Sequence, residues 1–179
     1  WRLFTDLDLS DAKKPAFASL HDCFTRELVD GARPFAADPA VLASPCDGIV
    51  GAHGRVEGEE VWQAKGYPYS AVELFGETAL AERFRGGRYV TLRLTSAMYH
   101  RFHAPLDGTV TRIDYISGDC WNVNPIALAR VERLFCRNER AVVRMRTAAG
   151  GHEIALVPVA AVLVASMRFA FVDVRLHLR

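Results

Sequence analysis

The chain has 179 residues, half of them hydrophobic and 24% charged, so it is long enough for one packed domain or two small, closely packed halves. Its 22 basic and 21 acidic residues give a formal net charge of +1, which argues against a nucleic-acid-binding protein. This balance still permits a local patch that binds a membrane surface. No apolar run approaches the roughly 18 residues of a bilayer span. The four cysteines are scattered without a CxxC pair, which favours reduced thiols in a cytosolic compartment over a disulfide framework.

Residues 1–39 are predicted to form an N-terminal helical segment. Within residues 15–30, Phe17, Leu20, Phe24 and Leu28 recur at helical spacing, with Pro15 suited to the first turn and Gly31 to the stop. The apolar face of this helix is expected to pack on the domain, and membrane contact is the alternative. Further interfacial anchors are suggested at Trp1, Leu3 and Phe4.

Residues 40–179 are predicted to form a β-rich core, incomplete at its C-terminal end, within an α+β, mostly antiparallel β fold. Short apolar runs alternate here with glycine-containing turns, and their β-branched and aromatic residues are typical of strands. The one interior helix is expected at Ala71–Phe84. The predicted strands are Tyr89–Leu94, Thr109–Ile116, Ala141–Thr147, Ile154–Val164 and Met167–Leu178.

A seven-residue pattern occurs twice, as SPCDGIV at 44–50 and as APLDGTV at 104–110. Both copies place Pro-x-Asp-Gly before an apolar residue, which predicts a tight turn followed by the start of a strand. Two copies 60 residues apart suggest two related β units, packed as a pseudo-symmetric pair in the manner of a barrel-sandwich hybrid; a chance match is the alternative.

The densest group of reactive side chains is Tyr99-His100-Arg101-Phe102-His103. Histidine moves protons near neutral pH, so His100 and His103 are candidate acid–base groups. In an extended segment they would face opposite sides, whereas in a tight turn they would share one cavity. A zinc site is the alternative interpretation: the two histidines would supply two of its three or four ligands, and His53 or Asp47 would have to complete it.

An aspartate beside a histidine would make a general base, because the carboxylate orients the imidazole that takes the proton. Asp47 and Asp107 occupy equivalent turn positions, and the residues alone do not decide which of them pairs with a histidine. No GxSxG nucleophile motif occurs. Glu139 and Arg140 are interpreted as an ordinary solvated pair.

Taken together, the motifs resemble the phosphatidylserine decarboxylase family. The resemblance runs through six short matches in order, over about 125 residues. They are Phe17–Leu28 with Gly31–Pro34, Ser44–Gly48, Lys65-Gly66 with Tyr69-Ser70 and Leu74, Tyr99–His103 with Pro105 and Asp107-Gly108, Val123–Pro125, and Leu134-Phe135 with Asn138–Arg140.

The resemblance implies a pyruvoyl enzyme that converts phosphatidylserine to phosphatidylethanolamine. In this family a proenzyme cleaves itself at a Gly-Ser bond, and the serine becomes the pyruvoyl cofactor at the start of a small chain. Asp47 and His103 match the family's aspartate and histidine of the processing triad. His100 matches the histidine implicated in decarboxylation, where its expected role is to protonate the carbanion-like centre or to position the departing carboxylate.

The resemblance also implies partners. These are the small pyruvoyl-bearing chain, phosphatidylserine and the cytoplasmic face of a membrane, where a peripheral protein is expected. A homodimer is one arrangement that the sequence allows. No metal and no nucleic acid is implied. No Gly-Ser-Thr site precedes Arg179, so the pyruvoyl serine is expected beyond that residue and this portion alone is expected to be inactive.

Cys46 stands where the family usually has alanine, and an oxidation-sensitive thiol beside Asp47 is one consequence. Two other functions compete with the decarboxylase. The first is a carrier module of the barrel-sandwich type, for which the lysines are scarce, namely Lys13, Lys14 and Lys65, although His103 imitates a phospho-carrier histidine. The second is a zinc hydrolase built on His100 and His103.

Overall fold

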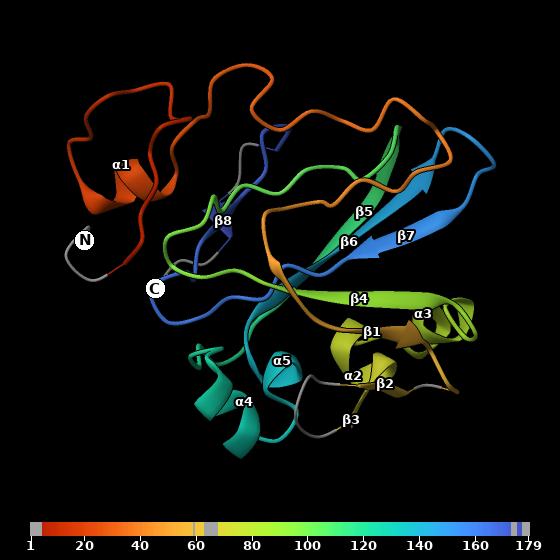
Figure 1. The fold of residues 1–179 in the computed structure, drawn as a ribbon. Coiled ribbons are helices and arrows are strands. Elements are labelled where there is room, and N and C mark those ends of the chain that lie inside the picture. Colours follow the sequence, from red (N-terminus) through yellow and green to blue (C-terminus); the bar gives the residue numbers. More distant parts are fainter. Residues whose placement is uncertain (1–4, 59, 63–67, 173–174, 177–179) are drawn as a thin grey trace.

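The computed structural model describes residues 5–58, 60–62, 68–172 and 175–176. Its described strands form four antiparallel sheets, which confirms the predicted α+β class with mostly antiparallel β structure (Figure 1). The largest sheet has the order β5 (Gly108–Ile116), β6 (Arg140–Thr147), β7 (Glu153–Leu156). The second pairs β1 (Ile49–Arg55) with β4 (Arg88–Arg93). The small ones pair β2 (Glu60–Trp62) with β3 (Pro68–Ser70), and β8 (Met167–Arg168) with β9 (Arg175–Leu176).

Strand β6 is the centre of the fold. It lies between β5 and β7, and all of its residues except Arg146 are buried. Ala141 and Val143 pack with Phe169, which brings the chain that follows β7 back onto the sheet. A continuous apolar run was predicted over Ile154–Val164, but the strand stops at Leu156. Pro158 lies just beyond this end, and proline cannot donate a ladder hydrogen bond.

The two Pro-x-Asp-Gly copies begin equivalent strands. β1 starts directly after Asp47-Gly48, and β5 starts at Gly108. The pairing of β1 with β4 slips between Val50 and Ala52, and the pairing of β5 with β6 slips between Val110 and Arg112. These irregularities stand 60 residues apart, as the two sequence copies do. The repeat is therefore present in strand register as well as in sequence, while a barrel-sandwich arrangement of the sheets remains a prediction.

The helix expected over residues 15–30 is much shorter, because α1 covers only Leu20–Phe24. Ser19 caps its start, and the chain after Thr25 turns to pair with residues 11–13 instead of continuing the helix. Lys13 donates its backbone N–H to the Glu27 carbonyl at 2.9 Å, and Val29 donates to the Asp11 carbonyl at 2.8 Å. The apolar spacing overstated this helix because backbone pairing overrides weak helical propensity. The anchors suggested at Trp1, Leu3 and Phe4 lie outside the described residues, and a domain division after residue 39 remains a prediction.

The helix expected at Ala71–Phe84 is divided into α2 (Ala71–Phe75) and α3 (Thr78–Arg83). Gly76 adopts a φ of 69°, a left-handed conformation that suits glycine and ends α2. Two further helices, α4 (Pro125–Arg130) and α5 (Leu134–Arg137), were not predicted from the sequence. Asn124 and Pro125 look like a turn signal in the sequence, but Asn124 accepts a hydrogen bond from the Ala127 N–H and so caps α4.

The interpretation of Glu139 and Arg140 as a solvated pair is wrong, because both residues are buried. The Arg140 guanidinium donates to four carbonyl oxygens, those of Glu73, Leu74, Cys136 and Asn138, at 2.6–2.9 Å. Glu139 accepts a hydrogen bond from the Tyr115 hydroxyl at 2.8 Å. The polar run at 138–140 thus joins α2 and α5 to the central sheet, because buried polar groups must find partners inside the protein.

Candidate functional site

Two loops that lie far apart in sequence meet at the candidate site. One precedes β1 and contains Asp47, and the other joins β4 to β5 and contains both histidines; the course of both loops can be followed in Figure 1. His103 donates its backbone N–H to the Pro45 carbonyl at 2.7 Å, and Ala43 donates to the Pro105 carbonyl at 3.0 Å. These bonds place His103 beside the turn that presents Asp47. Asp107 has no such relation to a histidine, and its carbonyl accepts the Ala148 N–H within the β5–β6 region.

Asp47 is held by an arginine that the sequence analysis did not assign to the site. The Arg33 Nε and one terminal nitrogen each lie 2.7 Å from a different Asp47 oxygen, which is a bidentate pair. The same guanidinium donates to Asp11 at 3.0 Å. The hydrogen bonds from Arg33 hold the pKa of Asp47 below its ordinary value, against the opposing effect of burial, and the charge of His103 acts in the same direction as Arg33. Asp47 is therefore a fixed, ionised carboxylate at neutral pH.

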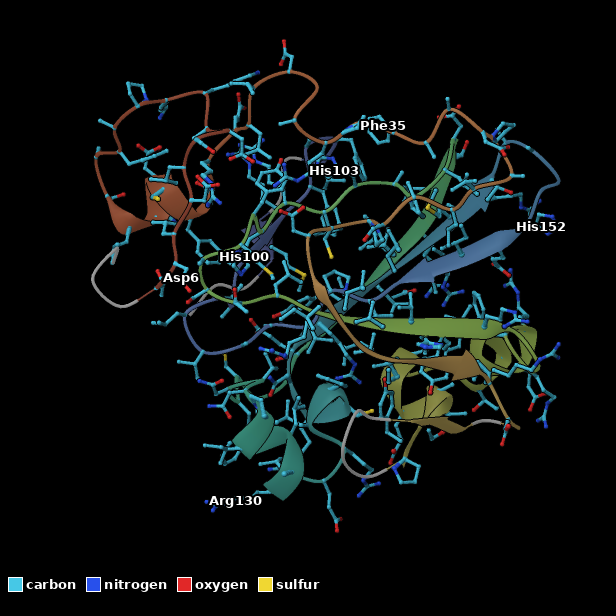
Figure 2. All side chains as sticks on the ribbon, viewed as in Figure 1. Asp6, Phe35, His100, His103, Arg130 and His152 are labelled. Carbon is cyan, nitrogen blue, oxygen red and sulfur yellow. The ribbon has the colours of Figure 1, made fainter. Side chains whose placement is uncertain are left out.

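His103 is exposed and lies between two aromatic rings. Tyr99 is buried and stacks on the His103 ring with a centroid distance of 5.9 Å, and Phe35 meets it edge-on at 6.5 Å. Figure 2 shows His103 beside Phe35. Within the described part of the chain, the Asp47 carboxylate bonds to Arg33 and makes no direct hydrogen bond to the His103 ring. The ring is thus oriented by aromatic contacts and by its own backbone bond.

His100 has a different environment. Its ring stacks on Phe24 of α1 with a centroid distance of 3.9 Å, and Nδ1 lies 2.9 Å from the Met98 carbonyl oxygen. A carbonyl oxygen only accepts, so Nδ1 carries the hydrogen and Nε2 is the proton acceptor of the neutral ring. Burial lowers the pKa of His100 below 6.5, and the charge of Arg26 adds to this effect. His100 is therefore neutral at pH 7.

The two histidines do not share a helical turn. The chain turns at residues 95–98, where Met98 donates its N–H to the Thr95 carbonyl, and then runs on without helix or strand to residue 107. The rings of His100 and His103 consequently have different aromatic neighbours, and Figure 2 shows His100 nearer to α1 than His103 is. Arg101 lies between them and donates to the Thr25 carbonyl at 2.9 Å, which ties this segment to α1.

The described residues contain no group of three or more His, Cys, Asp or Glu side chains arranged to hold a metal ion. A zinc site on His100 and His103 thus has no third ligand in the part of the chain that the structure covers. The four cysteines are free. Burial, followed by the charge of Asp47, raises the pKa of the Cys46 thiol, so this thiol stays protonated and is less reactive than its position in the sequence suggests.

The sequence profile of the phosphatidylserine decarboxylase family matches residues 20–177. The chain belongs to the phosphatidylserine decarboxylase family. It is 41% identical over 172 residues to the phosphatidylserine decarboxylase proenzyme of Aliivibrio salmonicida, covering 94% of this chain and 59% of the relative. The corresponding protein of Shewanella denitrificans is 39% identical, with 90% and 56% coverage, and that of Erwinia tasmaniensis is 40% identical, with 80% and 50% coverage. The chain thus spans about half to three-fifths of the length of these relatives.

Two arginines of the candidate site, Arg33 and Arg26, were not assigned to it from the sequence. Arg33 appears in the sequence only as part of Gly31–Pro34, and nothing in that run indicates a partner 14 residues away. Arg26 follows α1 and is buried beside the loop that carries His100. Basic side chains close to a candidate carboxylate or histidine are visible only once the loops are folded. The Lys65-Gly66 motif of the phosphatidylserine decarboxylase resemblance lies outside the described residues.

Proposed function

We propose that this chain is the large portion of a pyruvoyl-dependent phosphatidylserine decarboxylase that forms by self-cleavage of a proenzyme. The observation that supports this most directly is the backbone bond from His103 to Pro45, which holds His103 beside the turn that contains Asp47, in a chain that belongs to the decarboxylase family. Asp47, His103 and His100 are proposed as the residues that act. Phosphatidylserine, the small chain that bears the pyruvoyl group and a membrane surface at the cytoplasmic face are proposed as partners.

In the proposed self-cleavage, His103 takes the proton from the hydroxyl of the cleavage serine. The serine oxygen then attacks the preceding carbonyl carbon, the peptide C–N bond breaks as the imidazolium returns the proton to the serine nitrogen, and an ester replaces the peptide bond. Elimination from this ester releases the carboxylate of the large chain and leaves dehydroalanine, which water hydrolyses to the pyruvoyl carbonyl with loss of ammonia. A positive charge develops on the imidazole as the proton arrives. The ionised Asp47 stabilises that charge, and Arg33 keeps the carboxylate ionised and in one orientation. Asp47 thus acts through its charge on a neighbouring ring.

In the proposed decarboxylation, the pyruvoyl group supplies an electron sink for the bond that loses CO₂. The described residues suit that chemistry, because the neutral, half-buried imidazole of His100 lies on a loop that the buried Arg26, at the end of α1, contacts through the Ala97 carbonyl. His100 presents Nε2 as its free nitrogen, since Nδ1 is engaged by the Met98 carbonyl. Nε2 takes up a proton and returns it to the carbon that has lost its carboxylate.

The proposal is tested by the intact mass of the full-length protein under denaturing conditions. Two chains are expected, the smaller with a blocked N-terminus whose mass fits pyruvoyl in place of serine. Release of CO₂ from phosphatidylserine by the same preparation completes the test. A single uncleaved chain that has a serine at the expected junction and releases no CO₂ would contradict the proposed function while leaving the fold intact.

Attachment to the membrane surface is a separate part of the proposal. It rests on the lipid nature of the proposed substrate. In the described part of the chain, no helix has the length and apolar character needed to cross a bilayer. Sedimentation of the full-length protein with phosphatidylserine-containing vesicles, compared with vesicles of neutral lipid alone, measures the attachment directly.

A further inference from the structure

Arg26 is a buried arginine whose hydrogen bonds use little of its capacity. Its residue is 6% exposed, and it follows directly after α1 and Thr25. One terminal nitrogen donates to the Cys23 carbonyl and the other to the Ala97 carbonyl, both at 3.3 Å, which is long for such bonds. The Nε is buried and has no hydrogen-bond partner. A guanidinium carries five N–H donors, so most of this group's capacity is unused.

Arg26 also has no direct ion-pair partner in the described part of the chain, although its charge acts on Asp47 and Asp8 from a longer distance. The other buried arginines differ, because Arg144 pairs with Glu77 and Asp114, and Arg140 donates to four carbonyl oxygens at short distances. A buried charge without a partner is unfavourable, and proteins retain such groups where a ligand supplies the opposite charge.

Arg26 lies beside the loop that carries His100, the residue proposed for decarboxylation. It donates to the carbonyl of Ala97, which precedes His100 by three residues, and Phe24 of the same segment stacks on the His100 ring. The titratable groups that face its charge are His100, Asp47 and Asp8, each of which is affected by it from a separate part of the chain. The guanidinium, at the end of α1, therefore acts electrostatically on the proposed decarboxylation histidine of the neighbouring loop.

We infer that Arg26 binds an oxyanion of the phospholipid headgroup and so anchors the substrate beside His100. The inference rests on the proposed function and names a binding group for it. Phosphate and carboxylate both offer paired oxygens that match the guanidinium edge containing Nε, and lysine cannot reproduce this geometry. The long bonds to Cys23 and Ala97 are weak, so the guanidinium can turn toward the ligand without losing strong contacts.

The first experiment compares Arg26→Gln and Arg26→Lys in the full-length protein, with phosphatidylserine in mixed micelles as the substrate. Self-cleavage is expected to continue, because the hydrogen bonds from Arg33 dominate over the charge of Arg26 in keeping Asp47 ionised. KM for phosphatidylserine is expected to rise about tenfold or more in Arg26→Gln, as loss of a charged hydrogen bond predicts. Arg26→Lys keeps the charge without the paired donors, so its KM is expected to lie between those of the wild type and Arg26→Gln. An unchanged KM in both variants overturns the inference.

Arg101→Gln is the matched control. Arg101 joins the same two segments, since it donates to the Thr25 carbonyl, but it is exposed and lies near Glu27. A role of Arg26 as a mere link between α1 and the loop predicts the same small effect in both glutamine variants. Urea unfolding of each variant shows whether it is folded. If Arg26→Gln is unfolded, the KM of Arg26→Lys for phosphatidylserine tests the inference instead. Failure of the wild type to form a pyruvoyl chain would overturn the proposed function itself, which separates the two failures.

A second measurement identifies which oxyanion Arg26 holds. Glycerophosphoserine carries both phosphate and carboxylate, and glycerophosphoethanolamine carries the phosphate alone. If Arg26 binds the phosphate, Arg26→Gln weakens inhibition by both compounds. If it binds the carboxylate, only inhibition by glycerophosphoserine weakens. Inhibition by both compounds that equals the wild type contradicts the inference.

Discussion

The backbone N–H of His103 lies 2.7 Å from the carbonyl oxygen of Pro45, and a second hydrogen bond repeats this relationship with the roles exchanged. His103 corresponds to Ala43 in the 60-residue repeat, and Pro45 corresponds to Pro105. The Ala43–Pro105 bond is therefore the symmetry mate of the His103–Pro45 bond. A local two-fold relation joins the two motifs, and the candidate site forms at this junction.

This junction explains how the two copies contribute differently to one site. The first copy contributes Asp47, and the chain just before the second contributes His103. Ala43 and Asp107, the counterparts of His103 and Asp47, carry neither the imidazole nor a carboxylate beside a histidine. The proposed acid–base pair thus depends on residues in which the two copies differ, while the turns that both copies share supply the geometry that brings the pair together.

Loss of the Arg33 clamp is expected to slow self-cleavage. Arg33→Ala removes both hydrogen bonds to Asp47, so the pKa of Asp47 returns toward its ordinary value and the carboxylate loses its fixed orientation. We expect cleavage to be slower by about tenfold, which corresponds to about 1.4 kcal/mol in the barrier. Mass spectrometry of the cleavage products over time measures the rate.

The control for Arg33 is Arg112→Ala. Arg112 forms an exposed pair with Asp114 on β5, with Nε 2.7 Å from the carboxylate, and it lies away from the site. Its loss is expected to leave the cleavage rate unchanged. Because the folded-state pKa of Asp47 is depressed, the Arg33–Asp47 attraction is present above the ordinary pKa of aspartate and is lost as the pH falls through the depressed value. Equal cleavage rates in wild type and Arg33→Ala would remove Arg33 from the mechanism.

The roles proposed for Asp47, His103 and His100 are expected to separate by mutation. Asp47→Asn and His103→Ala should prevent self-cleavage, because one removes the charge that stabilises the imidazolium and the other removes the base. His100→Ala should leave cleavage near the wild-type rate and reduce decarboxylation by at least about a hundredfold, the usual contribution of a general acid–base group. Gel analysis of the chains and CO₂ release measure the two steps independently. Normal processing by His103→Ala would show that the base is another residue.

The ring of His100 is expected to titrate below the ordinary histidine pKa of 6.5, because burial disfavours the imidazolium. The folded state thus binds fewer protons than the unfolded state between the depressed value and 6.5, so stability rises with pH through that window and falls on acidification. Phe24→Ala removes the ring stacked on His100 and should raise its pKa toward 6.5. NMR titration of the His100 ring in the wild type and in Phe24→Ala measures the two pKa values. Phe102 lies on the same loop as His100, and its ring contacts Phe169. Phe102→Leu alters that contact and should leave the His100 titration unchanged.

Arg140 is expected to be essential for stability even though it lies outside the site. Arg140→Met removes the buried guanidinium that donates to four carbonyl oxygens, and a carbonyl left unsatisfied inside the protein costs about 1–3 kcal/mol, so we expect a loss of at least about 3 kcal/mol in the free energy of unfolding. Urea denaturation measures it. Arg137→Ala is the control, because this exposed arginine makes a 3.3 Å pair with Asp119, a type that contributes less than about 1 kcal/mol. Similar losses in both variants would contradict this account of Arg140.

Much of the β structure was predictable because strand signals are local. The runs Thr109–Ile116 and Ala141–Thr147 became β5 and β6 within one residue, since β-branched side chains and Asp-Gly turns act over a few positions. The shortening of α1 was not predictable, because it depends on the pairing of residues 27–29 with residues 11–13. The burial of Glu139 and Arg140 likewise depends on carbonyl groups from α2, more than 60 residues away.

The candidate site shows the same division. His100 and His103 were identifiable because their chemistry is visible in the residue types. The repeat singled out Asp47 and Asp107 equally, and only the family resemblance selected Asp47. Arg33 and Arg26 were not identifiable, since an arginine in a polar loop gives no sign of whether its charge will be paired, exposed or buried. The Arg33–Asp47 contact joins segments 14 residues apart, and the Arg26–Ala97 contact joins segments 71 residues apart.

The two-fold relation predicts unequal tolerance at the equivalent glycines Gly48 and Gly108. A Cβ on Gly108 would lie 2.3 Å from the Arg146 carbonyl oxygen, a backbone atom of β6 that cannot move without disturbing the central sheet. A Cβ on Gly48 would lie 3.1 Å from the Leu92 Cβ in the two-stranded sheet, where a shift of a few tenths of an ångström relieves the contact. Gly108→Ala is expected to destabilise the protein by about 3 kcal/mol or more, and Gly48→Ala by about 1 kcal/mol, the range for overpacking. Each alanine variant serves as the matched control of the other, with thermal or urea unfolding as the measurement. Equal losses would mean that the β5–β6 pairing yields as readily as the β1–β4 pairing, and β6 would then not be the rigid centre of the fold.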